Sequence, residues 1–276
     1  MYTRGRSRGG SSWGRLLVAA AVAIISLISY FGTRDTNPVT NEVQHVALTP
    51  QQEIALGLQA APEMAAQFGG LDPDEGDQQR VQSIGAQIVA NSPAQNTPYQ
   101  YDYHLLADPE TVNAFALPGG QIFITRALYD DLQTDAELAG VLGHETGHVV
   151  ARHSAEQIAK AQLTEGLTGA AVIAACDPYR SSNGCAYSAQ MAALIGQLIN
   201  MKYSRDDETE ADYLGVCFMD DTGYDPEAMI QVMQILQAQE SGQSPPEFLS
   251  THPSPENRIQ QIQLDIQNMD QCPGNQ

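Results

Sequence analysis

Two histidines four residues apart, His144 and His148, lie in the sequence His-Glu-Thr-Gly-His, with Glu145 directly after the first. On a helix these histidines are one turn apart on the same face, so both imidazoles can bind one metal ion. Glu145 lies about 100° round the helix from His144, beside the ion rather than on it. That is the position of a general base for a metal-bound water. His-Glu-x-x-His on a helix is the signature of zinc hydrolases. The alternative is an ordinary helix with two surface histidines, which can have the same sequence by chance.

The residues around the motif predict the helix that it needs. Thr134 and Glu137 have the spacing of a capping box, in which a hydroxyl and a carboxylate satisfy the first free backbone amides. We expect the helix to continue through Ala161. Apolar positions recur at helical spacing and put the motif beside a buried stripe; they are Leu138, Val141, Leu142 and Val149.

A third ligand is needed, because catalytic zinc commonly has three protein ligands and a water. His153 lies nine residues after His144, about 180° round a continuous helix, so we expect it beside the site or on the surface. Glu208 and Asp212 are four apart and share a helix face, while Glu210 points elsewhere. One carboxylate would bind the metal, and the other would orient a ligand histidine. An acidic helix start favoured by the helix dipole is the alternative.

Around these residues the sequence predicts an α+β fold that is mainly helical. Residues 112–117 and 121–125 flank Pro118-Gly119-Gly120, which is typical of a hairpin, and residues 99–106 alternate as a strand does. This small antiparallel sheet precedes the motif helix, and its edge can hold an extended peptide or be scaffold alone. Residues 166–175 are apolar and short, and we expect a buried helix there rather than a surface against a bilayer. Other helices are expected at 49–68, 77–90 and 189–201.

The first 34 residues differ from the rest. Leu16 to Phe31 is a charge-free run preceded by four arginines, as in a signal anchor with its positive end inside. We expect residues 1–34 to form a single N-terminal transmembrane helix, 35–48 a linker, and 49–276 a zinc metallopeptidase domain. The domain would be extracytoplasmic, facing the periplasm from the inner membrane in a bacterium. A cleaved signal peptide, which releases a secreted or periplasmic protein, is the alternative.

The remainder of the chain is strongly acidic. Five of the 13 basic residues lie in the first 34 positions, and all 33 acidic residues follow them. So negative a body argues against nucleic acid as a partner and against docking its bulk on an anionic lipid surface. Solubility explains the charge better than an acid-driven substrate preference. The sequence predicts no oligomeric state.

Four cysteines suit an oxidising compartment. Cys176 and Cys185 flank a short polar segment and can close it into a loop, and Cys217 with Cys272 would then tie down the last segment. Buried free thiols are the alternative. No Cys-x-x-Cys occurs, which argues against a structural zinc site.

Two segments carry a resemblance to a known family. Gly143 to Ser154 reads Gly-His-Glu-x-Gly-His-Val-x-Ala-Arg-His-Ser, and Tyr203 to Gly215 reads Tyr-Ser-Arg-x-x-Glu-x-Glu-Ala-Asp-x-Leu-Gly. Both resemble the HtpX/BepA-LoiP/CAAX prenyl protease-type family of zinc metalloendopeptidases, which are gluzincins with a zincin-like fold. Residues 113–120 and 250–258 are also similar to that family, and the likeness spans about Thr49 to Met269.

The resemblance implies one zinc ion per chain. Its ligands would be His144, His148 and Glu208, with Glu145 as the catalytic base, which leaves Asp212 to orient a ligand histidine. The loop around His252 would close over the site. The strand that borders the substrate cleft would contain Asn113, Ala114, Phe115 and Ala116.

The role of that loop stays open. His252 would be a reversible extra ligand or a transition-state donor, or it would only hold the turn before the next helix. Arg258 would anchor the loop to a carboxylate. The implied function is hydrolysis of peptide bonds in protein substrates, above all misfolded or membrane and envelope proteins, as part of quality control. The alternative is a tethered chaperone-like or binding module with a latent zinc site, against which the intact Glu145 argues.

Overall fold

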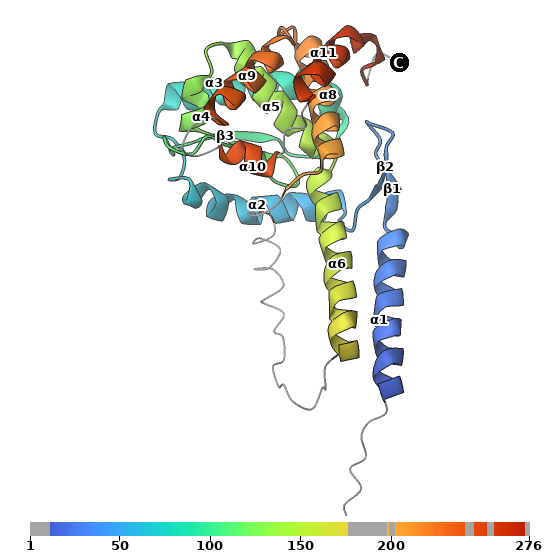
Figure 1. The fold of residues 1–276 in the computed structure, drawn as a ribbon. Coiled ribbons are helices and arrows are strands. Elements are labelled where there is room, and N and C mark those ends of the chain that lie inside the picture. Colours follow the sequence, from blue (N-terminus) through green and yellow to red (C-terminus); the bar gives the residue numbers. More distant parts are fainter. Residues whose placement is uncertain (1–11, 176–197, 199–201, 241–245, 253–256, 274–276) are drawn as a thin grey trace, which may run out of the picture.

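The computed structural model describes residues 12–175, 198, 202–240, 246–252 and 257–273. Most of these residues are helical, and the helices lie on both sides of one small sheet (Figure 1). The α+β, mainly helical class expected from the sequence is therefore confirmed. Apart from Leu198, the helix predicted at 189–201 lies outside the described residues, and so do Cys176 and Cys185.

The small sheet has three strands in the order β3–β5–β4. β4 (Ala114–Ala116) and β5 (Gln121–Thr125) form the predicted antiparallel hairpin. β3 (Asp102–Leu106) pairs with β5 in parallel, so the sheet is mixed rather than purely antiparallel. The reason is the connection: residues 107–113 cross the end of the sheet and leave β5 between the other two strands. All five residues of β5 are buried, as expected for a central strand.

The turn of the hairpin packs against the helix on the lower face of the sheet. Gly119 and Gly120 have φ values of 84° and 111°, which favour glycine. A methyl group added to Gly119 would lie 2.4 Å from the Cα of Ile54. Ile54 belongs to α2 (Pro50–Gln67), which begins with the predicted capping box. The Pro-Gly-Gly sequence thus allows the hairpin to lie against α2.

The other face of the sheet is covered by the helix that carries the motif and by its neighbours. Tyr103 of β3 lies against Gly85, and its hydroxyl is 2.8 Å from the hydroxyl of Thr146 on the motif helix. A large apolar core fills the space between these elements. The elements are α3 (Glu75–Asn91), η1 (Pro93–Asn96), α4 (Arg126–Asp131), α5 (Asp135–Val150), α8 (Arg205–Thr222), α9 (Ala228–Glu240), α10 (Glu247–Thr251), α11 (Arg258–Gln267) and η2 (Met269–Gln271).

The last segment is tied to the core by a disulfide. Cys217 on α8 is bonded to Cys272, which follows η2. Both cysteines are buried. The pairing predicted for these two residues is confirmed.

The segment predicted to be a linker is a docked hairpin. β1 (Arg34–Thr36) and β2 (Val43–His45) pair antiparallel directly after α1 (Ser12–Gly32). The Asn37 side chain donates to the carbonyl oxygen of Val150 at 2.8 Å, and Gln44 donates to that of Ala151. These bonds satisfy carbonyl groups that the end of α5 leaves free. The linker prediction for 35–48 is therefore wrong, because its polar residues cap α5.

The motif helix does not continue through Ala161 as predicted. Arg152 has a φ of 62°, in the left-handed region, which ends α5 and starts α6 (His153–Ala175) in a new direction. Its guanidinium is held by Glu53 of α2, with Nε 3.0 Å from Oε1. Residues 166–175 are helical, as predicted. They belong to α6, and this part of α6 runs beside α1 and away from the other described helices (Figure 1).

Candidate active site

α5 carries the motif in the interior of the molecule. Its start has the predicted capping box: the Thr134 hydroxyl accepts the amide of Glu137, and the Glu137 carboxylate accepts the amide of Thr134. Every residue from Glu137 to Val150 is buried. The two motif histidines are therefore core residues, which contradicts the alternative of two surface histidines.

α8 approaches α5 closely because small residues face each other where the helices cross. A methyl group added to Gly147 would lie 3.0 Å from the carbonyl oxygen of Ala211. Such an approach between backbones leaves no room for a side chain at this point. As a result Glu208 and Asp212, on the same face of α8, reach the histidines of α5.

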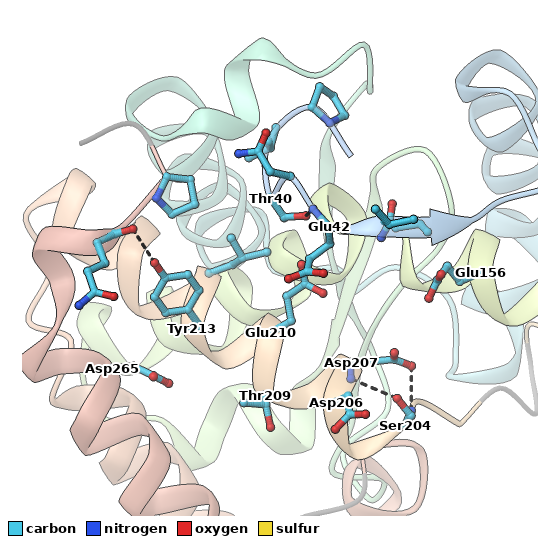
Figure 2. A pocket seen from close by; sticks show the side chains of 18 of the residues that line it. Thr40, Glu42, Glu156, Ser204, Asp206, Asp207, Thr209, Glu210, Tyr213 and Asp265 are labelled. Carbon is cyan, nitrogen blue, oxygen red and sulfur yellow. Dashed lines mark hydrogen bonds between the residues drawn. The ribbon is translucent and has the colours of Figure 1, made fainter. Parts of the chain in front are cut away.

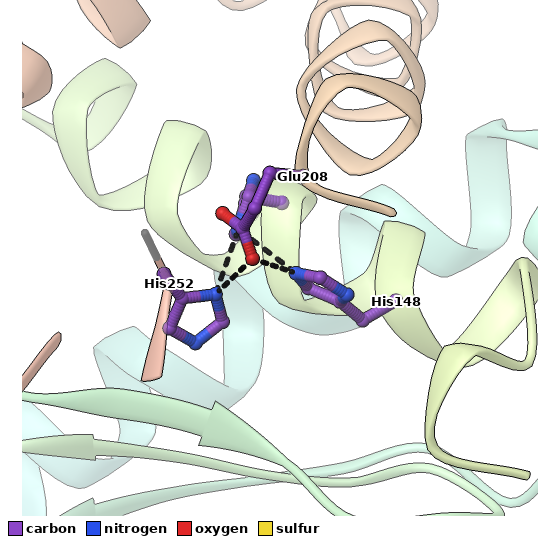
Figure 3. Close-up of side chains that lie close together, drawn as sticks. His148, Glu208 and His252 are labelled. Atoms are coloured by element: carbon purple, nitrogen blue, oxygen red, sulfur yellow. Dashed lines mark hydrogen bonds and ion pairs between the residues drawn. The ribbon is translucent and has the colours of Figure 1, made fainter. Parts of the chain in front are cut away.

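In this interior four side chains direct atoms that can bind a metal toward one another (Figure 3). They are His144, His148, Glu208 and His252. The Nε2 atoms of His144 and His148 are 3.1 Å apart. Glu208 has Oε2 3.6 Å from the first nitrogen and Oε1 3.4 Å from the second. The Nδ1 of His252 lies 2.9 Å from Glu208 Oε1 and 3.4 Å from His144 Nε2.

Three of these separations, 3.4–3.6 Å, match the spacing of ligands around one metal ion, and the other two, 2.9 and 3.1 Å, are shorter. Ligands in a tetrahedral site with metal bonds of about 2.0–2.2 Å are about 3.3–3.6 Å apart. Three imidazole nitrogens and a carboxylate oxygen are also a donor set that divalent transition metals prefer. The structure thus brings His144, His148 and Glu208 together, as expected, and adds His252 as a fourth member.

Asp212 lies behind His144 rather than in the cluster. Its Oδ1 is 2.9 Å from the Nδ1 of His144, so the other ring nitrogen faces the cluster. Arg258 donates to both oxygens of Asp212, at 2.6 and 2.8 Å, and lies 3.1 Å from Glu208. Burial acts to raise the pKa of Asp212, but Arg258 and His144 outweigh it and hold that pKa below its ordinary value. An ionised Asp212 is a strong acceptor for the His144 ring.

His148 is supported by residues that the sequence left without a clear role. Its Nδ1 is 2.8 Å from the Nδ1 of His153, whose Nε2 is 3.2 Å from Glu210. The ring of Tyr203 stacks on His148 with ring centroids 3.9 Å apart. His153 is thus beside a ligand, as expected. The break at Arg152, rather than the rotation of a continuous helix, puts it there.

Glu145 faces the cluster without being held by it. Among the residues that the structure describes, neither carboxylate oxygen has a hydrogen-bond partner, and the side chain is fully buried. The Nε2 of His252 lies 3.6 Å from Glu145 Oε1. Burial raises the pKa of Glu145 above its ordinary value. A carboxyl group with a raised pKa beside a metal site is suited to proton transfer near neutral pH.

His252 joins the cluster from the end of α10. It follows α10, and its amide donates to the carbonyl oxygen of Phe248 at 2.7 Å. Its ring stacks on that of Phe248 with centroids 4.3 Å apart. Tyr203, just before α8, is bonded to the residue before His252: its amide donates to the carbonyl oxygen of Thr251 at 3.1 Å. His252 therefore lies at the site, while residues 253–256 of its loop are outside the described residues.

A small pocket of about 50 Å³ adjoins the cluster between α2 and β4. Away from β5, β4 has no strand partner within the described ranges. The Oδ1 of Asn113, just before β4, is buried and without a hydrogen-bond partner in the part of the chain that the structure describes. The free edge at 113–116 therefore borders the pocket beside the ligand cluster. The lining includes Met64, Phe68, Asn113, Phe115, Ala116, Tyr203 and His252.

A larger hollow of about 1020 Å³ lies between α8 and residues 38–44 (Figure 2). Its walls carry several carboxylates, including those of Glu42, Asp206 and Glu210. Its described lining contains no member of the four-residue cluster. A polar, acidic hollow of this kind is a solvated surface, so the small pocket beside His252 is the better candidate for substrate.

Comparison with known proteins places the chain in a family. The pattern of peptidase family M48 matches residues 75–265, which include α5, α8 and the whole cluster. The chain belongs to peptidase family M48. Its domain is a metalloprotease domain of that family, and the family resemblance predicted from the motifs is confirmed.

Several M48 relatives match over most of this chain. The beta-barrel assembly-enhancing protease of Yersinia pestis is 33% identical over 218 residues, which are 77% of this chain and 43% of the relative. That of Escherichia coli (strain K12) is 32% identical over 193 residues, 66% of this chain and 37% of the relative. The mitochondrial metalloendopeptidase OMA1 of Schizosaccharomyces pombe is 30% identical over 240 residues, which are 86% of this chain and 67% of the relative. The chain spans less than half the length of the two bacterial relatives.

Proposed function

We propose that this chain is a membrane-anchored, zinc-dependent metalloendopeptidase that acts in protein quality control. The observation that supports it most directly is the convergence of His144, His148 and Glu208 beside the unbonded carboxylate of Glu145. The proposed ion is zinc, because two imidazoles and a carboxylate are the ligands of many catalytic zinc sites. Membership of family M48 supports the same ion.

In this proposal the Nε2 atoms of both motif histidines and the Glu208 carboxylate would hold one zinc ion. When bound there, zinc lowers the pKa of a water and polarises the scissile carbonyl. With the ion in place, Glu145 would serve as the base, taking a proton from the attacking water on a carboxylate oxygen and giving it to the leaving amine. Asp212 keeps His144 in the tautomer that leaves its Nε2 free to bind.

The substrate is proposed to bind as an extended strand along the free edge of β4. Main-chain hydrogen bonds would hold the peptide, and one of its side chains would enter the small pocket between Phe68 and Phe115. Folded proteins rarely present an unpaired strand, whereas misfolded ones do. This geometry therefore favours misfolded proteins as substrates. Membrane or envelope proteins among them are favoured because the bacterial relatives are named beta-barrel assembly-enhancing proteases.

His252 lies where a substrate carbonyl would have to enter. We infer that the loop around His252 withdraws before hydrolysis, and that Arg258 keeps the start of α11 fixed to Asp212. A site closed in this way also fits the second candidate, a tethered chaperone-like or binding module with a latent zinc site. Hydrolysis distinguishes the two functions, since only the first requires it.

The proposed location is a membrane, with α1 as the anchor. Trp13–Gly32 is long and apolar enough to cross a bilayer. Three arginines before it, Arg15 near its start, and the disulfide in the body support an extracytoplasmic domain, on the periplasmic face of the inner membrane in a bacterium. Residues 1–34 would be the anchor and 49–276 the metallopeptidase domain. Release after signal cleavage is the alternative.

The experiment compares the full-length protein with Glu145→Gln in detergent. Both are incubated with an unfolded protein, with and without a zinc chelator. We expect the parent to hydrolyse the substrate only without chelator, and Glu145→Gln to retain one zinc per chain and lose at least 100-fold in rate. Substantial turnover by Glu145→Gln would refute the assigned base. Absence of turnover in a zinc-loaded parent, including a His252→Ala form, would favour the binding module.

A further inference from the structure

α6 changes character along its length. Its first turns belong to the body: Ile158 is fully buried, and Glu156 accepts the amide of His45 at 3.0 Å. From Gly166 to Ala175 it carries no charged residue. Figure 1 shows this part running beside α1, away from all other described helices. The core does not explain its apolar composition.

The contact between α6 and α1 is close, and the two helices run in opposite directions. A methyl group added to Gly166 would lie 2.2 Å from the Oγ of Ser26. One turn further along α6, Ala170 is buried, and nearer the start of α1, Ala19 is buried. Small residues at such a contact let two helices approach in a membrane, where tight packing replaces the hydrophobic effect. The contact also fixes the depth of α6 relative to α1.

That depth follows from the helical rise. At about 1.5 Å per residue, Ser26 lies about 9 Å from the Gly32 end of α1, and Gly166 lies at the same level. Ala175 is nine residues further along, or about 14 Å deeper. The hydrocarbon layer is about 30 Å thick. If α1 crosses it from Trp13 to Gly32, residues 166–175 lie within it. The last charge before them, Glu165, is then about 8 Å inside the level of Gly32.

We propose that Gly166–Ala175 of α6 is a second membrane-embedded segment, which lies against α1 in the same bilayer. The proposal rests on the membrane anchoring by α1 stated above. Leu167, whose exposed fraction is 37%, and Ile25 of α1, at 65%, then contact lipid chains rather than water. The partner of this face is therefore the lipid bilayer itself.

A two-helix attachment has a consequence for the active site. One flexible tether leaves a body free to rotate, whereas two packed helices that enter the membrane together fix its orientation. α2 lies across the base of the body, on the side from which α1 and α6 extend (Figure 1). α2 carries Met64, which lines the pocket beside His252. The pocket is thereby held near the membrane surface, where segments of membrane proteins that leave the bilayer can reach it.

The test uses spin labels on the full-length protein in phospholipid vesicles. Cys176 and Cys185 are replaced by serine, and the disulfide-bonded cysteines are left in place. Single cysteines then report three positions: Leu167→Cys on α6, Ile25→Cys on α1 as the lipid control, and Leu264→Cys on α11 as the water control, whose parent side chain is 50% exposed. Collision rates are measured with oxygen, which concentrates in lipid, and with a water-soluble nickel complex.

We expect Leu167→Cys and Ile25→Cys to collide mainly with oxygen, and Leu264→Cys mainly with nickel. A nickel-dominated result at Leu167→Cys with an oxygen-dominated one at Ile25→Cys overturns this inference and leaves the anchor intact. Collision mainly with the nickel complex at both Leu167→Cys and Ile25→Cys would contradict the membrane anchor as well. Low collision with both probes at Leu167→Cys means enclosure by protein and also overturns the inference. The double variant Ser26→Cys/Gly166→Cys should form a disulfide under mild oxidant. Absence of this disulfide would contradict the contact between α6 and α1.

Discussion

One glycine at the crossing of α5 and α8 should control metal affinity. In Gly147→Ala the new methyl group would lie 3.0 Å from the carbonyl oxygen of Ala211 and 3.2 Å from its Cα. Ordinary contacts of this kind begin at about 3.4 Å, so α8 has to shift by a few tenths of an ångström. Metal–ligand distances tolerate about 0.2 Å. Glu208 is one turn before Ala211 and moves with it.

We therefore expect Gly147→Ala to weaken zinc binding by about 10–100-fold, the range found when the support of a ligand is disturbed. This corresponds to about 1.4–2.8 kcal/mol. The matched control is Gly143→Ala, one turn earlier on α5, where the closest contact is 3.4 Å, to the carbonyl oxygen of Gly215. Both changes raise helix propensity by up to about 1 kcal/mol, so propensity does not separate them.

The assay is a zinc titration of the full-length protein in detergent against a chromophoric chelator at neutral pH, with circular dichroism to confirm the fold. The parent and Gly143→Ala should have the same affinity within a factor of about three, while that of Gly147→Ala should be lower. Equal affinities for the two alanine variants would refute the reasoning that the backbone separation at Gly147 positions Glu208.

Three further predictions concern the support of the site and the fold. Asp212→Asn should lower zinc affinity by about 10–100-fold with little change in secondary structure, measured by the same titration; an unchanged affinity would exclude it as the partner of His144. Cys217→Ser opens a disulfide with a sequence separation of 55 and should lower the free energy of unfolding by about 4 kcal/mol, measured by urea denaturation; a loss below about 1 kcal/mol would contradict the prediction. Hydrogen bonds from Arg126 lower the pKa values of Asp72 and Asp77 below their ordinary 3.8, so this stabilisation is present above about pH 4 and is lost as the pH falls through the lowered values. Arg126→Met should therefore be less stable than the parent at pH 6, and the difference should shrink below pH 4; a difference that does not change with pH would be inconsistent with this.

Local spacing was sufficient to predict which side chains of α5 and α8 lie together. His144 and His148 are fixed by one turn of helix, and the capping box at Thr134 is also a local signal. Glu208 and Asp212 are separated from them by about 60 residues, yet their own four-residue spacing placed both on one face of one helix. Such signals survive because helical periodicity depends on near neighbours alone.

Features that depend on distant partners were missed. The break after α5 requires Arg152 to be held by Glu53, 99 residues earlier in the chain, and no local pattern reports that contact. The docking of residues 35–48 requires the free carbonyl groups at the end of α5 as partners. β3 was recognised as a strand, but its parallel pairing depends on how residues 107–113 cross the sheet. In each case tertiary contacts decided between local alternatives.

The most direct test of the account is a crystallographic anomalous difference map of the Glu145→Gln protein, measured on both sides of the zinc absorption edge. We expect one zinc peak about 2.0–2.2 Å from His144 Nε2, His148 Nε2 and an oxygen of Glu208. A peak bonded to Glu210 or Asp212 instead, or no peak between the two motif histidines in zinc-loaded protein, would contradict it.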